Sequence, residues 1–168
     1  ELTITPKMSS GPGHHETTYL MIKTQMDIDH RQKRVMDAGC GTAILSIMAS
    51  KLGAKEVEAF DIDEWSVTNG RENIAANKCS NINNQQGKLE ELNIVGPFDL
   101  ILANINKNVL LEEIKLYRKY LAPAALMVLS GFYVNDIPEI LLEGSRYGLT
   151  ELKRDVRGDW AALVLAVG

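Results

Sequence analysis

The chain has 168 residues, of which 45% are hydrophobic and 24% charged, and its net charge is −4. This length suits one domain with a single core, and no apolar run approaches the ~20 residues that span a bilayer. The acidic balance argues against a general nucleic-acid binder, whose footprint is basic. Cys40 and Cys79 form no metal or redox spacing. We therefore expect a reduced, cytoplasmic setting without a membrane or a metal.

The first half of the chain alternates helical and strand-like patterns. Residues 1–15 read as extended and loop-like, and because the chain begins at Glu1 without an initiator methionine we expect a fragment or a processed domain. The periodicities then predict a helix over 16–28, a strand over 34–37, a helix over 42–52, a strand over 56–61 and a helix over 63–77. Asp63 is well placed to cap the last helix. His30 lies in a polar connection, where we expect it to be solvated.

The second half continues the alternation and ends differently. It predicts a weak strand over 83–87, a buried parallel strand over 98–104, a helix over 107–120 that stops near Pro123, and a strand over 124–130. Asp136 is expected to cap a helix that ends at Gly148. Two strand patterns, 150–157 and 160–167, flank a Gly-Asp turn and predict a β-hairpin.

This order of elements predicts one α/β domain over residues 1–168. The expected fold is a Rossmann-like, doubly wound sheet of seven strands, mostly parallel, with a C-terminal antiparallel hairpin.

The turn after the first predicted strand carries the clearest functional signal. Gly39 and Gly41 follow the acidic residue Asp37, and the next predicted strand ends in Asp61. Glycines let the backbone approach a ligand, and a carboxylate at the end of the second strand is suited to the two hydroxyls of a ribose. The pattern indicates an adenosine-containing cofactor.

The spacing of the glycines decides which cofactor is expected. A dinucleotide fingerprint needs a third glycine at position 44, which is Ile44, and no Walker A sequence follows the turn. S-adenosylmethionine has a ribose but no phosphate, so it suits this turn. Its methionine ammonium is cationic, and we expect Asp37 to lie close enough to help neutralise it.

Asn104 ends the fourth predicted strand and is the candidate catalytic residue. In open α/β sheets the ligand lies outside the carboxyl ends of the strands, so Asn104 is expected to face the same crevice. Its amide oxygen can accept a hydrogen bond from a substrate amine and aim the lone pair at the methyl group. The alternative is an amide that bonds its own loop backbone.

These motifs resemble the class I methyltransferases, and more narrowly the PrmA family, which methylates ribosomal protein L11. The resemblance covers essentially the whole chain. It rests on Gly-His-His-Glu-Thr-Thr at 13–18, Asp-Ala-Gly-Cys-Gly at 37–41, Gly-Ala-Lys at 53–55, Asp-Ile-Asp at 61–63, Leu-Ala-Asn-Ile at 102–105 and Leu-Ser-Gly at 129–131. It implies a protein N-methyltransferase that uses S-adenosylmethionine and modifies amines of a large-subunit ribosomal protein, with no direct nucleic-acid contact, as a monomer.

The resemblance also assigns roles to individual residues. It implies that Thr18 contacts the methionine end of the cofactor, with Thr17 as a second candidate, whereas the alternative for both threonines is helix capping. Gly39 and Gly41 would lie against the cofactor, Asp61 would hold its ribose, and Asn104 would sit by the transferable methyl group.

The chain departs from the family pattern in three places. The usual Phe-Gly-Thr-Gly loop reads Ser-Gly-Pro-Gly at 10–13, and Ser10 and Pro12 are expected to reduce cofactor affinity. Lys88 occupies a position where many class I enzymes have an acid for the adenine amine, so a main-chain contact would have to substitute. Nothing in the chain corresponds to the family's N-terminal recognition domain, so we expect the catalytic domain alone.

Other readings stay open. A class I methyltransferase with another substrate, or a cofactor-binding domain without turnover, would keep the same motifs, whereas Ile44 opposes an NAD-dependent oxidoreductase. His14 and His15 are candidates for proton transfer, but their adjacency in an extended loop argues against a metal pair. Cys40 has no base spaced to activate it, so we interpret it as a small buried thiol.

Overall fold

The structure is a computed structural model that describes residues 13–168. Seven strands within these residues form one sheet in the order β3-β2-β1-β4-β5-β7-β6. The strands are β1 Arg34–Ala38, β2 Glu56–Asp61, β3 Ile82–Gln86, β4 Phe98–Asn104, β5 Leu121–Tyr133, β6 Leu149–Arg157 and β7 Trp160–Val167. β7 runs antiparallel to β5 and β6, and the other neighbours are parallel. The predicted fold class, with its C-terminal hairpin, is confirmed.

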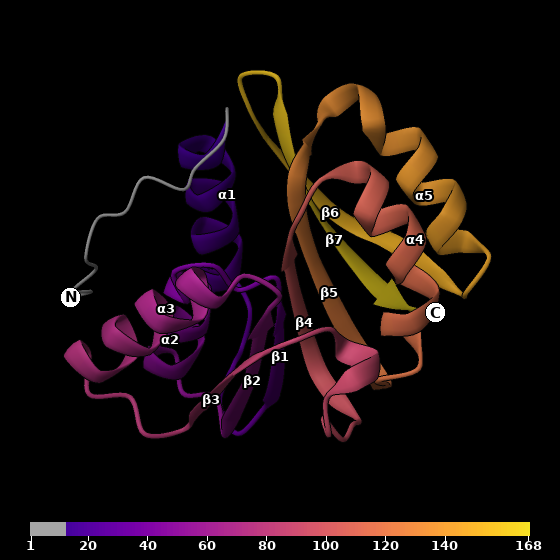
Figure 1. Cartoon of the computed structure of the whole chain (residues 1–168). Coiled ribbons are helices and arrows are strands. Elements are labelled where there is room, and N and C mark those ends of the chain that lie inside the picture. The colour runs from indigo at the N-terminus through magenta and orange to yellow at the C-terminus, as the bar shows by residue number, and fades with distance from the viewer. Residues whose placement is uncertain (1–12) are drawn as a thin grey trace.

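Helices cover both faces of the sheet (Figure 1). One face carries α1 His14–Met26, α2 Ile44–Lys51 and α3 Glu64–Ala76, and the other carries α4 Lys107–Arg118 and α5 Ile137–Ser145. Two 3-10 turns, η1 Leu89–Glu91 and η2 Val134–Asp136, follow β3 and β5. Two helix layers leave the carboxyl ends of the parallel strands as the edge at which a ligand can approach.

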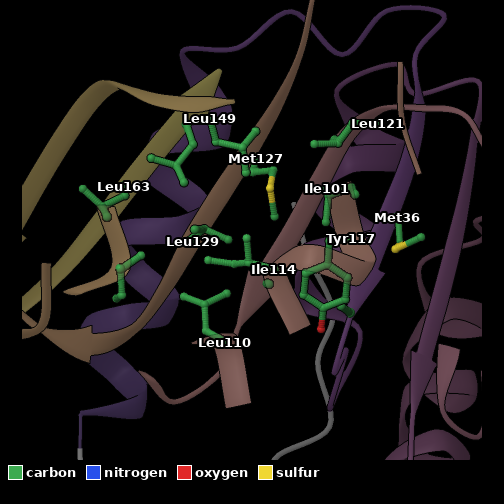
Figure 2. Close-up of a cluster of buried hydrophobic side chains, with 14 of the residues drawn as sticks. Met36, Ile101, Leu110, Ile114, Tyr117, Leu121, Met127, Leu129, Leu149 and Leu163 are labelled. Carbon is green, nitrogen blue, oxygen red and sulfur yellow. The ribbon is translucent and has the colours of Figure 1, made fainter. Parts of the chain in front are cut away.

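Strand β1 shows how the sheet separates two cores. Val35 and Met36 are both fully buried, but they belong to different clusters because successive side chains point to opposite faces. The cluster that contains Met36 is the largest and lies under α4 and α5 (Figure 2), and the cluster that contains Val35 lies under α1 and α2. The central strands are therefore fixed from both sides, which gives the strand ends a rigid base.

The helix starts follow local capping chemistry, which the sequence predicted only in part. Asp63 accepts a hydrogen bond from the backbone N–H of Ser66 at 2.9 Å, so its predicted cap on α3 is confirmed. The predicted cap by Asp136 is wrong, because its carboxylate accepts the backbone N–H of Tyr133 at 2.8 Å and closes η2 instead. Asn106 caps α4 through Val109 at 3.0 Å, which was not predicted.

The structure differs from two further predictions, the start of β5 and the exposure of His30. β5 begins before the predicted start at 124 because the chain pairs with β4 on both sides of an irregularity, where Pro123 lacks an N–H and Ala124 has a φ of 63°. The expectation that His30 is solvated is wrong: its side chain is 1% exposed and lies 2.9 Å from Gln25 Oε1. Burial lowers the pKa of His30.

Candidate functional site

The glycine turn and Asp61 form one hydrogen-bonded unit at the ends of β1 and β2. Gly39 and Gly41 have φ values of 67° and 52°, in the left-handed region that favours glycine. The N–H of Gly41 donates to Asp61 Oδ2, and the N–H of Asp63 donates to Oδ1, both at 2.9 Å. Each carboxylate oxygen keeps further acceptor capacity, so the turn fixes Asp61 without using up its ability to bind hydroxyls.

Three of the predicted site residues share the wall of one cavity. It has a volume of about 420 Å³ and is lined by Gly39, Asp61 and Asn104, which lie at the ends of β1, β2 and β4. The volume falls in the range of about 300–1,000 Å³ that is typical of small-molecule sites. The remaining described lining is Phe60, Ile62, Gly87, Lys88, Leu89, Ile105, Asn106, Val109, Glu113 and Tyr117. The strand-end rule therefore predicted the convergence of these three residues correctly.

A second cavity of about 630 Å³ is also lined by Asn104. The two cavities share Asn104, Ile105 and Asn106, so this short segment borders both of them and forms their junction. The second cavity also includes Tyr133 and Trp160, whose rings stack with centroids 4.2 Å apart. No hydrogen bond is made by the Asn104 side chain within residues 13–168, so its amide is available at the junction, and the loop-capping alternative finds no bond there.

Gly131 allows β5 to pass this junction closely. A Cβ atom at Gly131 would lie 2.5 Å from the carbonyl oxygen of Ile105, and the residue has a φ of 101°. The N–H of Ile105 in turn donates a hydrogen bond to the carbonyl oxygen of Ser130 at 2.9 Å. The position of Asn104 therefore depends on a glycine in the neighbouring strand.

The threonine pair lies in the first turns of α1. Thr17 is 3% exposed, lines the second cavity and donates a hydrogen bond to the carbonyl of His14 at 3.3 Å. Thr18 is half-buried and, within residues 13–168, belongs to the wall of neither cavity. The helix-capping alternative is wrong, because Gly13 is the N-cap residue and carries no side chain. Thr17 is thus the better placed of the two.

Asp37 lies behind the glycine turn. It is 1% exposed and accepts a hydrogen bond from Ser46 Oγ at 2.6 Å, while its Oδ1 has no partner in the described part of the chain. Burial, only partly opposed by the Ser46 hydrogen bond, raises the pKa of Asp37 to about 7. The described walls of the two cavities do not include Asp37, so its predicted role beside the methionine ammonium stays a prediction.

His14 lines one of the cavities, whereas Cys40 is buried in the core. His14 lines the second cavity, where desolvation and the neighbouring His15 lower its pKa. Cys40 is buried, with Sγ 3.4 Å from Asn84 Oδ1, and burial raises the pKa of its thiol well above the usual value. This confirms the interpretation of Cys40 as a buried thiol. Ser10 and Pro12 lie outside the described residues.

Across 13–168, no group of three or more His, Cys, Asp or Glu side chains is arranged to hold a metal ion. In the same part of the chain, no helix combines the length and the apolar character needed to cross a bilayer. The candidate site is the pair of cavities that share Asn104, because Gly39, Asp61 and Thr17 also line them.

Comparison with known proteins agrees with this geometry. The sequence profile of the family described as "Ribosomal protein L11 methyltransferase (PrmA)" matches residues 1–167. The chain belongs to this family. Curated PrmA relatives from Porphyromonas gingivalis and Bacteroides fragilis are 47% and 44% identical over 97% of the chain. The chain spans only 56% and 58% of their respective lengths.

Solved structures support the same assignment. The ribosomal protein L11 methylase of Lactobacillus delbrueckii subsp. bulgaricus superposes with a TM-score of 0.85 and 33% identity, covering 91% of this chain and 79% of that one. A methyltransferase from Pyrococcus furiosus has a TM-score of 0.78 at 18% identity, covering 98% and 88%, which shows the shared fold alone. The predicted resemblance to the PrmA family is confirmed.

Several wall residues were not predicted from the sequence. Tyr133 and Trp160 reach the second cavity because β5 and β7 place them opposite each other. The Leu-Ser-Gly sequence at 129–131 was part of the family resemblance, but the sequence assigned it no role. The close approach of Gly131 to the backbone of Ile105 gives a physical reason for a glycine at this position.

Proposed function

We propose that this chain is the catalytic domain of an S-adenosylmethionine-dependent protein N-methyltransferase, and that the acceptor is an amine of ribosomal protein L11. The observation that carries the proposal is the meeting of two cavities at Asn104, whose amide has no hydrogen-bond partner among residues 13–168. Methyl transfer needs a cofactor and an acceptor that enter separately and meet at one point. The names of the PrmA relatives supply the acceptor.

The residues of the smaller cavity fit this cofactor. Asp61 offers acceptor lone pairs to the ribose hydroxyls, and Gly39 lets the ligand approach the backbone where a side chain would press against Ile105 at 3.0 Å. Ile44 stands where a dinucleotide site would have its third glycine. When bound, the cofactor supplies a methyl group on a sulfonium, which is already a reactive electrophile.

The task left to the protein is alignment of the amine. Asn104 Oδ1 would accept a hydrogen bond from the amine and so orient the lone pair of the amine nitrogen towards the methyl group of the cofactor. A reactive alignment needs these two atoms about 3–3.5 Å apart. A lysine amine has an ordinary pKa near 10.4, so it must lose a proton before it attacks. The stacked rings of Tyr133 and Trp160 form part of the wall that this side chain would lie against. Thr17 and His14 complete the wall from α1.

The relatives' additional length bears on recognition of the ribosomal protein. We propose that residues 1–168 act as a single catalytic domain, and that the unmatched part of the relatives contributes to substrate choice. Action as a monomer in the cytoplasm, without direct nucleic-acid contact, stays a prediction.

Substitution of Asn104 tests the proposal. We expect Asn104→Ala to lower the rate of tritiated methyl transfer by about 10²-fold, because misaligned reactants lose the benefit of orientation. Binding of S-adenosylhomocysteine, measured by calorimetry, should change by less than about threefold because ribose contacts remain. Asn108→Ala is the matched control, since Asn108 lines the same cavity away from the junction. Equal rates for the two variants would remove Asn104 from the reaction.

Calorimetry also separates the alternative functions. Binding of S-adenosylhomocysteine without binding of NAD excludes the oxidoreductase. Binding without labelling of any acceptor would favour a cofactor-binding domain without turnover.

A further inference from the structure

The far end of the smaller cavity holds polar groups that the proposed reaction does not use. Asn104 marks the end at which methyl transfer is proposed, and Asp61 marks the ribose. Away from the ends of β1, β2 and β4, the wall is made by Gly87, Lys88 and Leu89 after β3 and by three residues of α4, Val109, Glu113 and Tyr117. If the proposed function holds, the adenine base occupies this end, since it is the part of the cofactor beyond the ribose.

The three residues of α4 form one stripe along the cavity. Val109, Glu113 and Tyr117 are spaced four residues apart, so they lie on one face of the helix. A rise of 1.5 Å per residue puts Glu113 about 9 Å along α4 from Lys107. The stripe leads away from the Asn104 junction, from an apolar side chain to an acid and then to a phenol.

An adenine edge requires a hydrogen-bond acceptor for its 6-amino group. Lys88 is cationic and only donates, which is the departure noted in the sequence. Among the described residues that line this cavity, the carboxylates are Asp61 and Glu113. Asp61 is tied to the glycine turn at the ribose, so Glu113 is the carboxylate available to the base.

The carboxylate of Glu113 is already oriented. The hydroxyl of Tyr117 donates a short hydrogen bond to Glu113 Oε2, whereas Oε1 accepts none within residues 13–168. The Tyr117 side chain is 1% exposed and packs in the largest core cluster, with its hydroxyl directed away from Ile101 (Figure 2). Burial, together with Glu113, raises the pKa of Tyr117, so the phenol remains a donor at neutral pH. A core residue thus holds one oxygen and leaves the other free.

We infer that Glu113 accepts a hydrogen bond from the adenine 6-amino group, and that Tyr117 acts as the positioning residue for this carboxylate. α4 thereby supplies from the opposite wall the acid that the loop after β3 lacks. The contact selects adenine over purines without the amine. It rests on the proposed function, because it requires S-adenosylmethionine in this cavity.

Calorimetric binding of two ligands tests the assignment without any turnover. The probes are S-adenosylhomocysteine and its analogue with purine in place of adenine, which lacks only the 6-amino group. A hydrogen bond to a charged group is strong enough that the native chain should bind the adenine ligand at least about tenfold more tightly. Glu113→Ala should bind the two ligands within about twofold of each other, because no carboxylate remains to distinguish them.

Three further variants sharpen the test. Glu112→Ala removes the neighbouring acid, which is exposed and, unlike Glu113, does not line the smaller cavity, and should keep the native preference. Tyr117→Phe should reduce the preference without abolishing it, since the carboxylate stays but loses its orientation. Glu113→Gln keeps a neutral acceptor and should show an intermediate preference, so it carries the test if Glu113→Ala does not fold.

The failures of the two proposals are distinguishable. If Glu113→Ala and Glu113→Gln bind the adenine ligand with the full native preference, the amine is held by the main chain near Lys88 and the inference is overturned. The cofactor site would then still stand. If the native chain does not bind S-adenosylhomocysteine at all, the proposed function fails and this inference fails with it.

Discussion

Removal of the Asp61 carboxylate should weaken cofactor binding far more than removal of its neighbour Asp63. In Asp61→Ala the ribose hydroxyls lose both carboxylate oxygens, and the N–H of Gly41 loses its acceptor. A hydrogen bond to a charged group contributes about 1.5–3 kcal/mol, and the half-buried position of Asp61 favours the lower value. Two such bonds amount to about 3 kcal/mol, or on the order of 10² in the dissociation constant.

Asp63→Ala is the matched control for this substitution. It removes the same charge two residues away, but Asp63 caps α3 through Ser66. Loss of a cap costs about 1 kcal/mol of stability, so this variant should unfold more easily yet bind S-adenosylhomocysteine within about twofold of the native chain. Isothermal titration calorimetry measures both constants. A change smaller than tenfold in Asp61→Ala, or equal weakening by both variants, would refute the ribose role of Asp61.

Two stability predictions follow from buried features of the site. The pKa of Asp37 rises from 3.8 to about 7 on folding, so the native chain binds a proton that the unfolded chain releases between these values. Stability from this group is greatest below pH 4 and is lost as pH rises to 7, by about 1.4 kcal/mol per pH unit at most. Asp37→Asn should flatten the denaturant-derived stability profile over this range, and an unchanged slope would contradict the assignment. Gly131→Ala should cost about 3 kcal/mol or more, because strain at positive φ adds to its clash with Ile105. Gly158→Ala, with φ of 62° and open space around it, should cost only about 1–2 kcal/mol. Equal losses in thermal unfolding would show that the close approach is unimportant.

The fold was predictable because its signals are local and repeated. The apolar run of β4 and the cap at Asp63 both depend on nearby residues, and both are as predicted. The errors occurred where long-range contacts decide the outcome. His30 looks solvated in sequence, but packing of α1 against α2 buries it beside Gln25, whose own amide reaches Leu45. Asp136 lies at the start of α5, but its carboxylate accepts the backbone N–H of Tyr133 in the turn after β5 and makes no cap bond to the helix.

The site was predictable to the extent that strand ends define it. Gly39, Asp61 and Asn104 each end or follow a parallel strand, so the topology alone brings them to one edge. Glu113 and Tyr133 reach the cavities only through the placement of α4 and the register of β5 with β7. Sequence spacing alone does not show how far Glu113 or Tyr133 lies from the cavities. Such residues are found only once helix packing and strand register are known.

The central claim is that this chain transfers methyl groups from S-adenosylmethionine to amines of ribosomal protein L11. Intact-mass spectrometry of purified L11, incubated with the chain and saturating S-adenosylmethionine, tests it most directly. We expect mass increments of whole methyl groups on L11 with the native chain and strongly reduced increments with Asn104→Ala. Unchanged L11, under conditions in which calorimetry shows the cofactor bound, would contradict it.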